Sequence, residues 1–313
     1  MGNPREAYGR ALADLAAQDQ RIWALDADLC RSTMSVYMEL EHPDRYVEAG
    51  IAEANMVGMA AGLALCGKVP FVSTFAVFLS GRAYDQIRQS ICLAGLSVKL
   101  CGSSAGLSDY GDGSTHQTVE DLSLMRALPG MTVLCPGDAR QAASAVVAAA
   151  RHPGPVYLRI GRSDTEDLPG DGTLEIGKMY PLREGSDSTI FATGAMVHPA
   201  LQAARLAQES GVSALVVNVS TLKPLDGAAA VSLAGRTGLA ISCEDHSVIG
   251  GLGAALSEVL NPHGIRLHRI GINDRFGQSS NSEAVLMEHY GLTARRIAER
   301  IVALAKEKEE APT

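Results

Sequence analysis

Glu53 is the residue of greatest chemical interest, because it is a carboxylate inside a segment of small and apolar residues. Residues 48–65 read EAGIAEANMVGMAAGLAL, and half of these positions are alanine or glycine. One interpretation is an exposed glutamate at a helix start, where the helix dipole favours a negative charge. The other is a buried carboxyl group, which holds its proton more tightly and suits acid–base chemistry. The local pattern alone favours the exposed glutamate.

Two phenylalanines follow a short apolar segment and could bind a flat ring. Phe75 and Phe78 lie three residues apart in STFAVFLSGRAYDQIR, and the chain has only 5 phenylalanines. Core packing is the simpler explanation of such a pair. Two aromatic rings just past a predicted strand could also form a stacking platform for a ligand.

A glycine-rich loop and two arginines complete the candidate residues. The stretch GDGSTHQ, residues 111–117, contains Asp112 and His116. An imidazole and a carboxylate beside adaptable backbone suit general acid–base chemistry, although Asp-Gly sequences also simply form turns. Arg5 and Arg162 have the sequence context of surface charges, but both adjoin element ends, where an arginine can hold a phosphate.

These residues fall at the ends of elements in an α/β pattern. Predicted strands and helices alternate up to about residue 162, which indicates a parallel sheet with helices on both faces. Residues 163–188 interrupt the pattern with proline, glycine and acidic residues, and alternation then resumes. We therefore expect a first domain over residues 1–165, a linker over 166–188 and a smaller second α/β domain over 189–313. Asp138 is the expected N-cap of the helix that follows it.

Composition excludes several classes of protein. The 313 residues suffice for two cores, and a formal net charge of −8 without a basic block argues against nucleic-acid or anionic-membrane partners. The 6 cysteines form no CxxC pair and lack zinc-ligand spacing, so we expect mostly buried free thiols in a reducing compartment. The N-terminus has no apolar leader segment, and we expect a cytoplasmic protein.

Taken together in chain order, the motifs resemble the C-terminal half of transketolase. The resemblance rests on DADL, GIAEANMVGMAAGLAL, STFAVF, DGSTHQ, LPGMTVLCPGD and VYLRIGR, and it covers nearly the whole chain. It implies two doubly wound α/β domains. The first would be the pyrimidine-binding domain of a thiamine diphosphate enzyme, and the second a transketolase C-terminal domain of structural role.

The resemblance assigns roles around the cofactor ring. Glu53 would be the catalytic glutamate that hydrogen-bonds a ring nitrogen of the aminopyrimidine, and Ile51 would prop the cofactor's bent conformation. Phe75 and Phe78 would flank the pyrimidine. A third aromatic residue of many relatives is replaced here by Gly81, which implies a looser ring pocket.

The resemblance also assigns substrate contacts. His116, a second catalytic residue, and Asp112 would contact the hydroxyls of the donor sugar, and Arg162 would bind its phosphate. When the chain is aligned without gaps from Asp28, Arg5 and Ser32 match the family's other phosphate contacts. Asp28 itself is placed among the cofactor-binding residues. Ser104 stands where relatives usually have a histidine near the thiazolium, and this leaves the donor and acceptor sugars open.

The metal-binding half of a thiamine diphosphate site is missing from the sequence. Its usual signature is GDG followed by Asn after about 25 to 30 residues, whereas the GDG motifs at Gly111 and Gly170 are followed first by the distant Asn218. The resemblance therefore implies a split enzyme, in which this chain binds no metal and an N-terminal partner subunit with GDG…N binds Mg²⁺. Thiamine diphosphate would be shared between the two subunits of an α2β2 heterotetramer.

The function that follows is transfer of a two-carbon ketol unit between phosphorylated sugars. One alternative is the beta subunit of a 2-oxo acid dehydrogenase component or a deoxyxylulose-phosphate-synthase-like half, since these enzymes share the pyrimidine domain. DGSTHQ followed by EDLSLMRALPG favours the transketolase side. A second alternative is a non-catalytic regulatory paralogue.

Overall fold

The first part of the chain builds a seven-stranded sheet with helices on both faces. The structure is a computed structural model that describes residues 1–310. The strands run in the order β10-β5-β6-β4-β3-β1-β2, and all neighbours are parallel except β10 and β5. The strands of this sheet are β1 (Ile22–Asp26), β2 (Tyr46–Glu48), β3 (Val69–Phe75), β4 (Lys99–Ser103), β5 (Thr132–Leu134), β6 (Val156–Arg159) and β10 (Thr221–Lys223).

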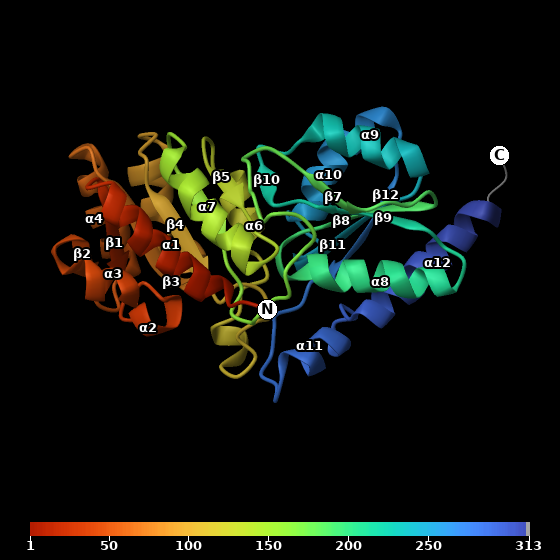
Figure 1. The fold of residues 1–313 in the computed structure, drawn as a ribbon, viewed down its shortest axis with the longest axis horizontal. Helices are drawn as coiled ribbons and strands as arrows, with labels where there is room; N and C mark the ends of the chain where they lie inside the picture. The colour runs from red at the N-terminus through yellow and green to blue at the C-terminus, as the bar shows by residue number, and fades with distance from the viewer. Residues whose placement is uncertain (311–313) are drawn as a thin grey trace.

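Helices α1 and α7 cover one face of this sheet, and α4 and the segments after β3 pack on the other (Figure 1). Asp138 caps α7 as expected, because its carboxylate accepts a hydrogen bond from the backbone N–H of Gln141 at 2.7 Å. The helical segments are α1 (Pro4–Gln18), α2 (Cys30–Thr33), α3 (Val36–Glu41), η1 (Pro43–Arg45), α4 (Glu53–Leu65), the π-helix η2 (Phe78–Arg82), α5 (Tyr84–Gln86), the π-helix η3 (Ile87–Cys92), η4 (Gly113–Thr115), α6 (Asp121–Ala127) and α7 (Ala139–Arg151).

The second part of the chain builds a five-stranded sheet in the order β12-β11-β8-β9-β7. Helices α8 and α12 pack on one face, and α9 and α10 on the other (Figure 1). Its elements are β7 (Tyr180–Arg183), β8 (Ser188–Ala192), η5 (Gly194–Met196), α8 (Val197–Glu209), β9 (Ala214–Asn218), α9 (Gly227–Thr237), β11 (Ala240–Ser247), α10 (Leu252–Leu260), η6 (Asn261–His263), β12 (Leu267–Ile272), α11 (Glu283–His289) and α12 (Ala294–Glu310).

Two short strands change the simple picture of two separate domains and a linker. Residues 180–183, inside the stretch expected to be a linker, form β7 and pair antiparallel with β9. Residues 221–223, from the second part of the chain, form β10 and pair antiparallel with β5 of the first sheet. Both lie at sheet edges, where a strand of three or four residues gains one neighbour and leaves little periodicity in the sequence.

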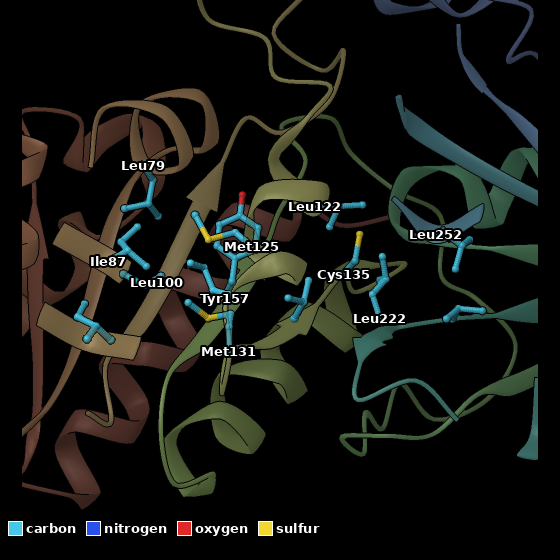
Figure 2. Close-up of a cluster of buried hydrophobic side chains, with 14 of the residues drawn as sticks. Leu79, Ile87, Leu100, Leu122, Met125, Met131, Cys135, Tyr157, Leu222 and Leu252 are labelled. Carbon is cyan, nitrogen blue, oxygen red and sulfur yellow. The ribbon is translucent and has the colours of Figure 1, made fainter. Parts of the chain in front are cut away.

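One hydrophobic core runs across the boundary between the two parts of the chain. Figure 2 shows this cluster extending from Tyr157 of the first part, through Leu122 and Cys135, to Leu222 and Leu252 of the second. Because this core is shared, we expect the two parts to form one stable unit rather than two loosely tethered domains.

A buried ion cluster lies at the same boundary. The Arg159 guanidinium, at the end of β6, donates from Nε to the Asp121 carboxylate at 3.0 Å and from Nη1 to the Asp245 carboxylate at 2.6 Å. The Tyr157 hydroxyl donates to Asp121 at 2.8 Å. Both aspartates are buried, so each carboxylate depends on Arg159 for its counter-charge.

Arg159→Met should destabilise the protein strongly, because it leaves two buried carboxylates without a cation. We expect a loss of about 3–5 kcal/mol in the free energy of unfolding, measured by urea denaturation. The control is Arg236→Met, whose partner Glu184 lies 2.6 Å away on the surface and whose loss should cost about 1 kcal/mol or less. Equal losses in the two variants would contradict this role of Arg159.

Candidate active site

Glu53 is the first residue of α4, and its side chain is only 1% exposed. The exposed glutamate favoured by the local pattern alone is therefore wrong, and the buried carboxyl group that the resemblance to transketolase predicts is confirmed. The group is also paired, because Arg82 Nη1 donates to the two carboxylate oxygens at 2.9 and 2.8 Å. The Arg82 side chain is 52% exposed, so this pair lies at the border between the core and solvent.

Arg82 was not among the residues singled out in the sequence. Sequence inspection could have found it from one signal, since it follows Phe78 by four residues in a helical stretch and so lies on the same side. Its guanidinium carbon lies 4.9 Å from the centre of the Phe78 ring, a cation–π contact.

The aromatic pair and the histidine form one group beside Glu53. Phe75 ends β3, Phe78 begins the π-helix η2, and their ring centres lie 5.9 Å apart at an angle of 16°. The His116 ring meets both edge-on, with its centre 5.4 Å from Phe78 and 6.2 Å from Phe75. The structure thus joins Glu53, Arg82, both phenylalanines and His116 into one contiguous cluster, with a buried carboxylate at one end and an imidazole at the other.

Asp112 and His116 belong to a single loop, residues 104–118, which we call the site loop. Asp112 is exposed at the start of η4, and the Thr115 hydroxyl lies 2.9 Å from His116 Nδ1. The loop follows β4, so it emerges at the carboxyl edge of the sheet, as β3 and Phe75 do. Open parallel sheets hold their ligands at this edge.

Arg5, Ser32 and Arg162 are also brought together. Arg5 Nη1 donates to the backbone oxygen of Ser32 at 2.8 Å, and Arg162 Nη1 donates to the Asp109 carboxylate at 2.9 Å. Burial lowers the pKa of Arg5, and the nearby positive charge of Arg162 lowers it further. Arg5 Nε is buried without a hydrogen-bond partner among the described residues. Two neighbouring guanidinium groups with an unused donor are suited to an anion.

The other two cofactor candidates lie in separate segments, because Asp28 follows β1 and Ile51 just precedes α4. The exposed Asp28 has a φ of +62°, and its backbone N–H donates to Glu48 Oε1 at 2.8 Å, as does the N–H of Gly50. Ile51 follows and is 75% exposed. Glu48 was not singled out in the sequence. Its carboxylate holds both the turn that carries Asp28 and the turn at Gly50, just before Ile51.

Asp26 supports the turn that carries Asp28. Its buried carboxylate accepts hydrogen bonds from the hydroxyls of Thr33 and Ser35 at 2.7 and 2.8 Å, and from the backbone N–H of Leu29 at 2.7 Å. Burial outweighs these bonds and raises the pKa of Asp26 to about 6.

The two departures from the transketolase pattern are Gly81 and Ser104. Gly81 leaves open space where many relatives have an aromatic ring, and Ser104 contributes a buried hydroxyl without a hydrogen-bond partner among residues 1–310. No heavy atom lies within 4 Å of the position of a Cβ at Gly81. Ser104 is fully buried with a φ of +52°, and its hydroxyl lacks a partner in the described part of the chain, as do those of Ser103 and Thr74. Unpaired buried hydroxyls are uncommon, and a bound group would satisfy them.

Metal and membrane sites are not found in residues 1–310. No group of three or more His, Cys, Asp or Glu there could hold a metal ion, and no helix in that range is long and apolar enough to cross a bilayer. The six cysteines are free thiols, as expected. The expected burial holds for Cys101, Cys135 and Cys243 only, because Cys66 is exposed and Cys30 and Cys92 are partly exposed.

Known protein families match both parts of the chain. The family model "Transketolase, pyrimidine binding domain" matches residues 3–167, and "Transketolase, C-terminal domain" matches residues 177–297. The second match begins before β7, in agreement with the pairing of that strand.

Three similar proteins cover nearly the whole chain. A "putative transketolase C-terminal section" of Methanocaldococcus jannaschii is 41% identical over 97% of this chain and 96% of its own. A "6-deoxy-6-sulfo-D-fructose transketolase subunit SqwH" of a Clostridium species is 42% identical over 94% and 91% of the two chains. A solved structure described as "Split gene transketolase, inactive beta4 tetramer" has a TM-score of 0.88 and 43% identity, and covers 97% and 98%.

Arg82→Ala should destabilise the free chain, because it leaves the buried Glu53 carboxylate without its counter-charge. We expect a loss of about 1–3 kcal/mol in the free energy of unfolding, reduced from that of a fully buried pair because Arg82 is half exposed. Adding Glu53→Gln should restore much of it, since a neutral amide costs less to bury. In urea denaturation the control Arg10→Ala, at the exposed pair with Glu6, should change little. A double variant no more stable than Arg82→Ala would contradict this pairing.

Proposed function

Since the chain belongs to the transketolase family, we propose that it is the C-terminal subunit of a two-subunit transketolase. With its partner it transfers a two-carbon ketol unit between sugar phosphates. The observation that carries this proposal is the buried Glu53 beside the Phe75–Phe78 pair, in a chain without GDG…N at the usual spacing. The transketolase family depends on thiamine diphosphate, and these residues have the chemistry of the pyrimidine half of its site.

The geometry around Glu53 is compatible with an aminopyrimidine ring. A carboxylate has about four acceptor positions, and one Arg82 nitrogen uses two of them. A ring nitrogen that bears a proton can use another, while the ring stacks on a phenylalanine. The unpaired hydroxyls of Thr74, Ser103 and Ser104 offer further donors at the carboxyl ends of β3 and β4.

The residues of this chain would divide the work as follows. Thiamine diphosphate, when bound, supplies the carbon nucleophile and the electron sink. Glu53 would hold a proton at the ring nitrogen, and its burial keeps competing water away. His116 and Asp112 would bind the hydroxyls of the donor sugar, and His116 can move a proton there. Arg5 and Arg162 would hold the terminal phosphate, with the Ser32 backbone fixing Arg5.

The partner that completes the site would be an N-terminal transketolase subunit with GDG…N, which binds Mg²⁺ and the diphosphate. The relatives support a split gene, because one is named a C-terminal section and another a subunit. The exposed side of α4 is suited to a close contact, since Met59 and Leu65 are exposed, and the positions of a Cβ at Gly58 and Gly62 face open space. We propose an α2β2 heterotetramer in the cytoplasm.

The first test reconstitutes the enzyme from this chain and an N-terminal transketolase subunit. We expect ketol transfer from xylulose or fructose phosphates that requires thiamine diphosphate and Mg²⁺, with pyruvate as the competing donor. Glu53→Gln should lower kcat about 100-fold or more, the range for loss of acid–base catalysis. The matched control Glu6→Gln, an exposed glutamate of α1, should not.

Each outcome of that test has a definite meaning. Turnover of pyruvate but of no sugar phosphate would favour the 2-oxo acid dehydrogenase or deoxyxylulose-phosphate-synthase type. Absence of cofactor uptake by the complex in calorimetry would identify a non-catalytic paralogue. Full activity of Glu53→Gln would remove Glu53 from the catalytic role.

Arg162→Met should raise KM for a phosphorylated donor sugar and leave KM for its unphosphorylated analogue unchanged. We expect an increase of about 10- to 100-fold, the range for losing a charged hydrogen bond. The control is Arg21→Met, whose exposed pair with Asp19 lies in the same part of the fold. Because one relative is named for a sulfo sugar, 6-deoxy-6-sulfofructose is included as a donor. A KM change of equal size for both sugars would place Arg162 outside the phosphate site.

A further inference from the structure

The connector between β12 and α11, residues 273–282, lies against the site loop although it comes from the other part of the chain. We call it the strap. The two segments run side by side at the lower middle of the molecule, below the N-terminus (Figure 1). The backbone N–H of Ser280 donates to the backbone oxygen of Tyr110 at 2.8 Å.

Gln117 forms the second connection between the site loop and the strap. Its side chain is only 4% exposed. Its amide nitrogen donates at 3.0 Å to the backbone oxygen of Asp109 and at 3.2 Å to that of Gln278. One side chain therefore joins the two limbs of the site loop and ties them to the strap, immediately after His116.

Two glycines show how closely the segments approach. A Cβ on Gly277 would lie 1.8 Å from Gln117 Oε1, so any larger residue must displace the Gln117 amide. Gly113 has a φ of +78°, and a Cβ there would lie 2.3 Å from the hydroxyl and 2.9 Å from the backbone nitrogen of Ser279. Gly113 directly follows Asp112, so the strap packs against the turn that carries this side chain.

The strap is itself held in place by the second domain. The Tyr290 hydroxyl, just beyond α11, donates to the backbone oxygen of Phe276 at 2.7 Å. The base of the site loop is also fixed by that domain, because the backbone N–H of Ser247 in β11 donates at 2.7 Å to the backbone oxygen of Val119, the residue directly after the loop. The second domain thus contacts the site loop at its base and at its tip.

We propose that the strap positions Asp112 and His116. Through these two residues the second domain would influence the affinity for the donor sugar without contacting the sugar itself. Gly277, Gln117 and Ser280 are the positioning residues. The proposal rests on the proposed function for its kinetic consequence, but not for the contacts themselves. It gives the second domain a role that the sequence did not indicate.

The experiment uses two variants of the strap, Gly277→Val and Ser280→Pro. Gly277→Val forces the Gln117 amide away from the backbone oxygens of Asp109 and Gln278. Ser280→Pro removes the backbone N–H that donates to the backbone oxygen of Tyr110. The control is Gly235→Ala in α9, where a Cβ meets nothing within 4 Å. Because Gly277→Val crowds the buried Gln117 amide and can destabilise the fold, Ser280→Pro is measured in parallel. Thermal melting of the full chain then shows whether each variant is folded.

The first measurement is hydrogen exchange in the full chain without cofactor or partner. We expect amides 109–118 to exchange about five- to tenfold faster in both variants, the size expected for losing a hydrogen bond, with β3 and α4 unchanged. The control should leave all of these unchanged. Unchanged exchange in the site loop of a folded variant would overturn the proposal, whether or not the chain is a transketolase.

The second measurement is kinetic, on the complex reconstituted with its partner. We expect KM for the ketose donor to rise about fivefold or more in the strap variants, with the dissociation constant of thiamine diphosphate unchanged. A general loss of stability would instead weaken the binding of both the ketose donor and thiamine diphosphate. If the cofactor constant rises with KM, the strap supports the whole fold rather than the site loop, and the proposal fails. If no complex turns over, the proposed function fails and the exchange result still decides the role of the strap.

Discussion

The buried Arg159 guanidinium is the interaction on which the arrangement of this molecule depends. It ends a central strand of the first sheet and neutralises one carboxylate from each part of the chain. Asp121 begins the helix just beyond the site loop, and Asp245 lies in a strand of the second sheet. Since a buried carboxylate without a cation is costly, the two parts can associate in few ways. The site loop leaves β4 and returns to this same cluster.

A second charged pair acts at the other side of the site. The fold places the Glu53 carboxylate at the start of α4, where free backbone N–H groups favour a negative charge. Arg82 reaches it from a π-helical stretch that begins at Phe78. π-helical turns are rare and are often found at functional sites, because the wider turn redirects a side chain. Here it brings the guanidinium over the aromatic ring and onto the carboxylate.

Much of this could be predicted from the sequence, and the remainder has identifiable physical causes. The alternation of helices and strands, the Asp138 cap and the grouping of Phe75 with Phe78 follow from local patterns. The burial of Glu53 does not, because tertiary packing against Arg82 decides it. Short edge strands such as β7 leave no periodicity, and the strap joins the site loop only through contacts between residues distant in sequence. Residue types therefore indicated the chemistry, but not which side chains support it.

The strand β10 has a consequence for how the chain can be divided. It is an edge strand of the first sheet, yet three strands and a helix of the second sheet, β7, β8, α8 and β9, precede it in the chain. A protein cut near residue 165 would lose it and leave β5 as a bare edge, with unpaired backbone groups that invite strand addition by another molecule. The boundary between the two domains in the sequence therefore does not coincide with the boundary between the two sheets in the folded molecule. Domain exchange between relatives would have to move this strand as well.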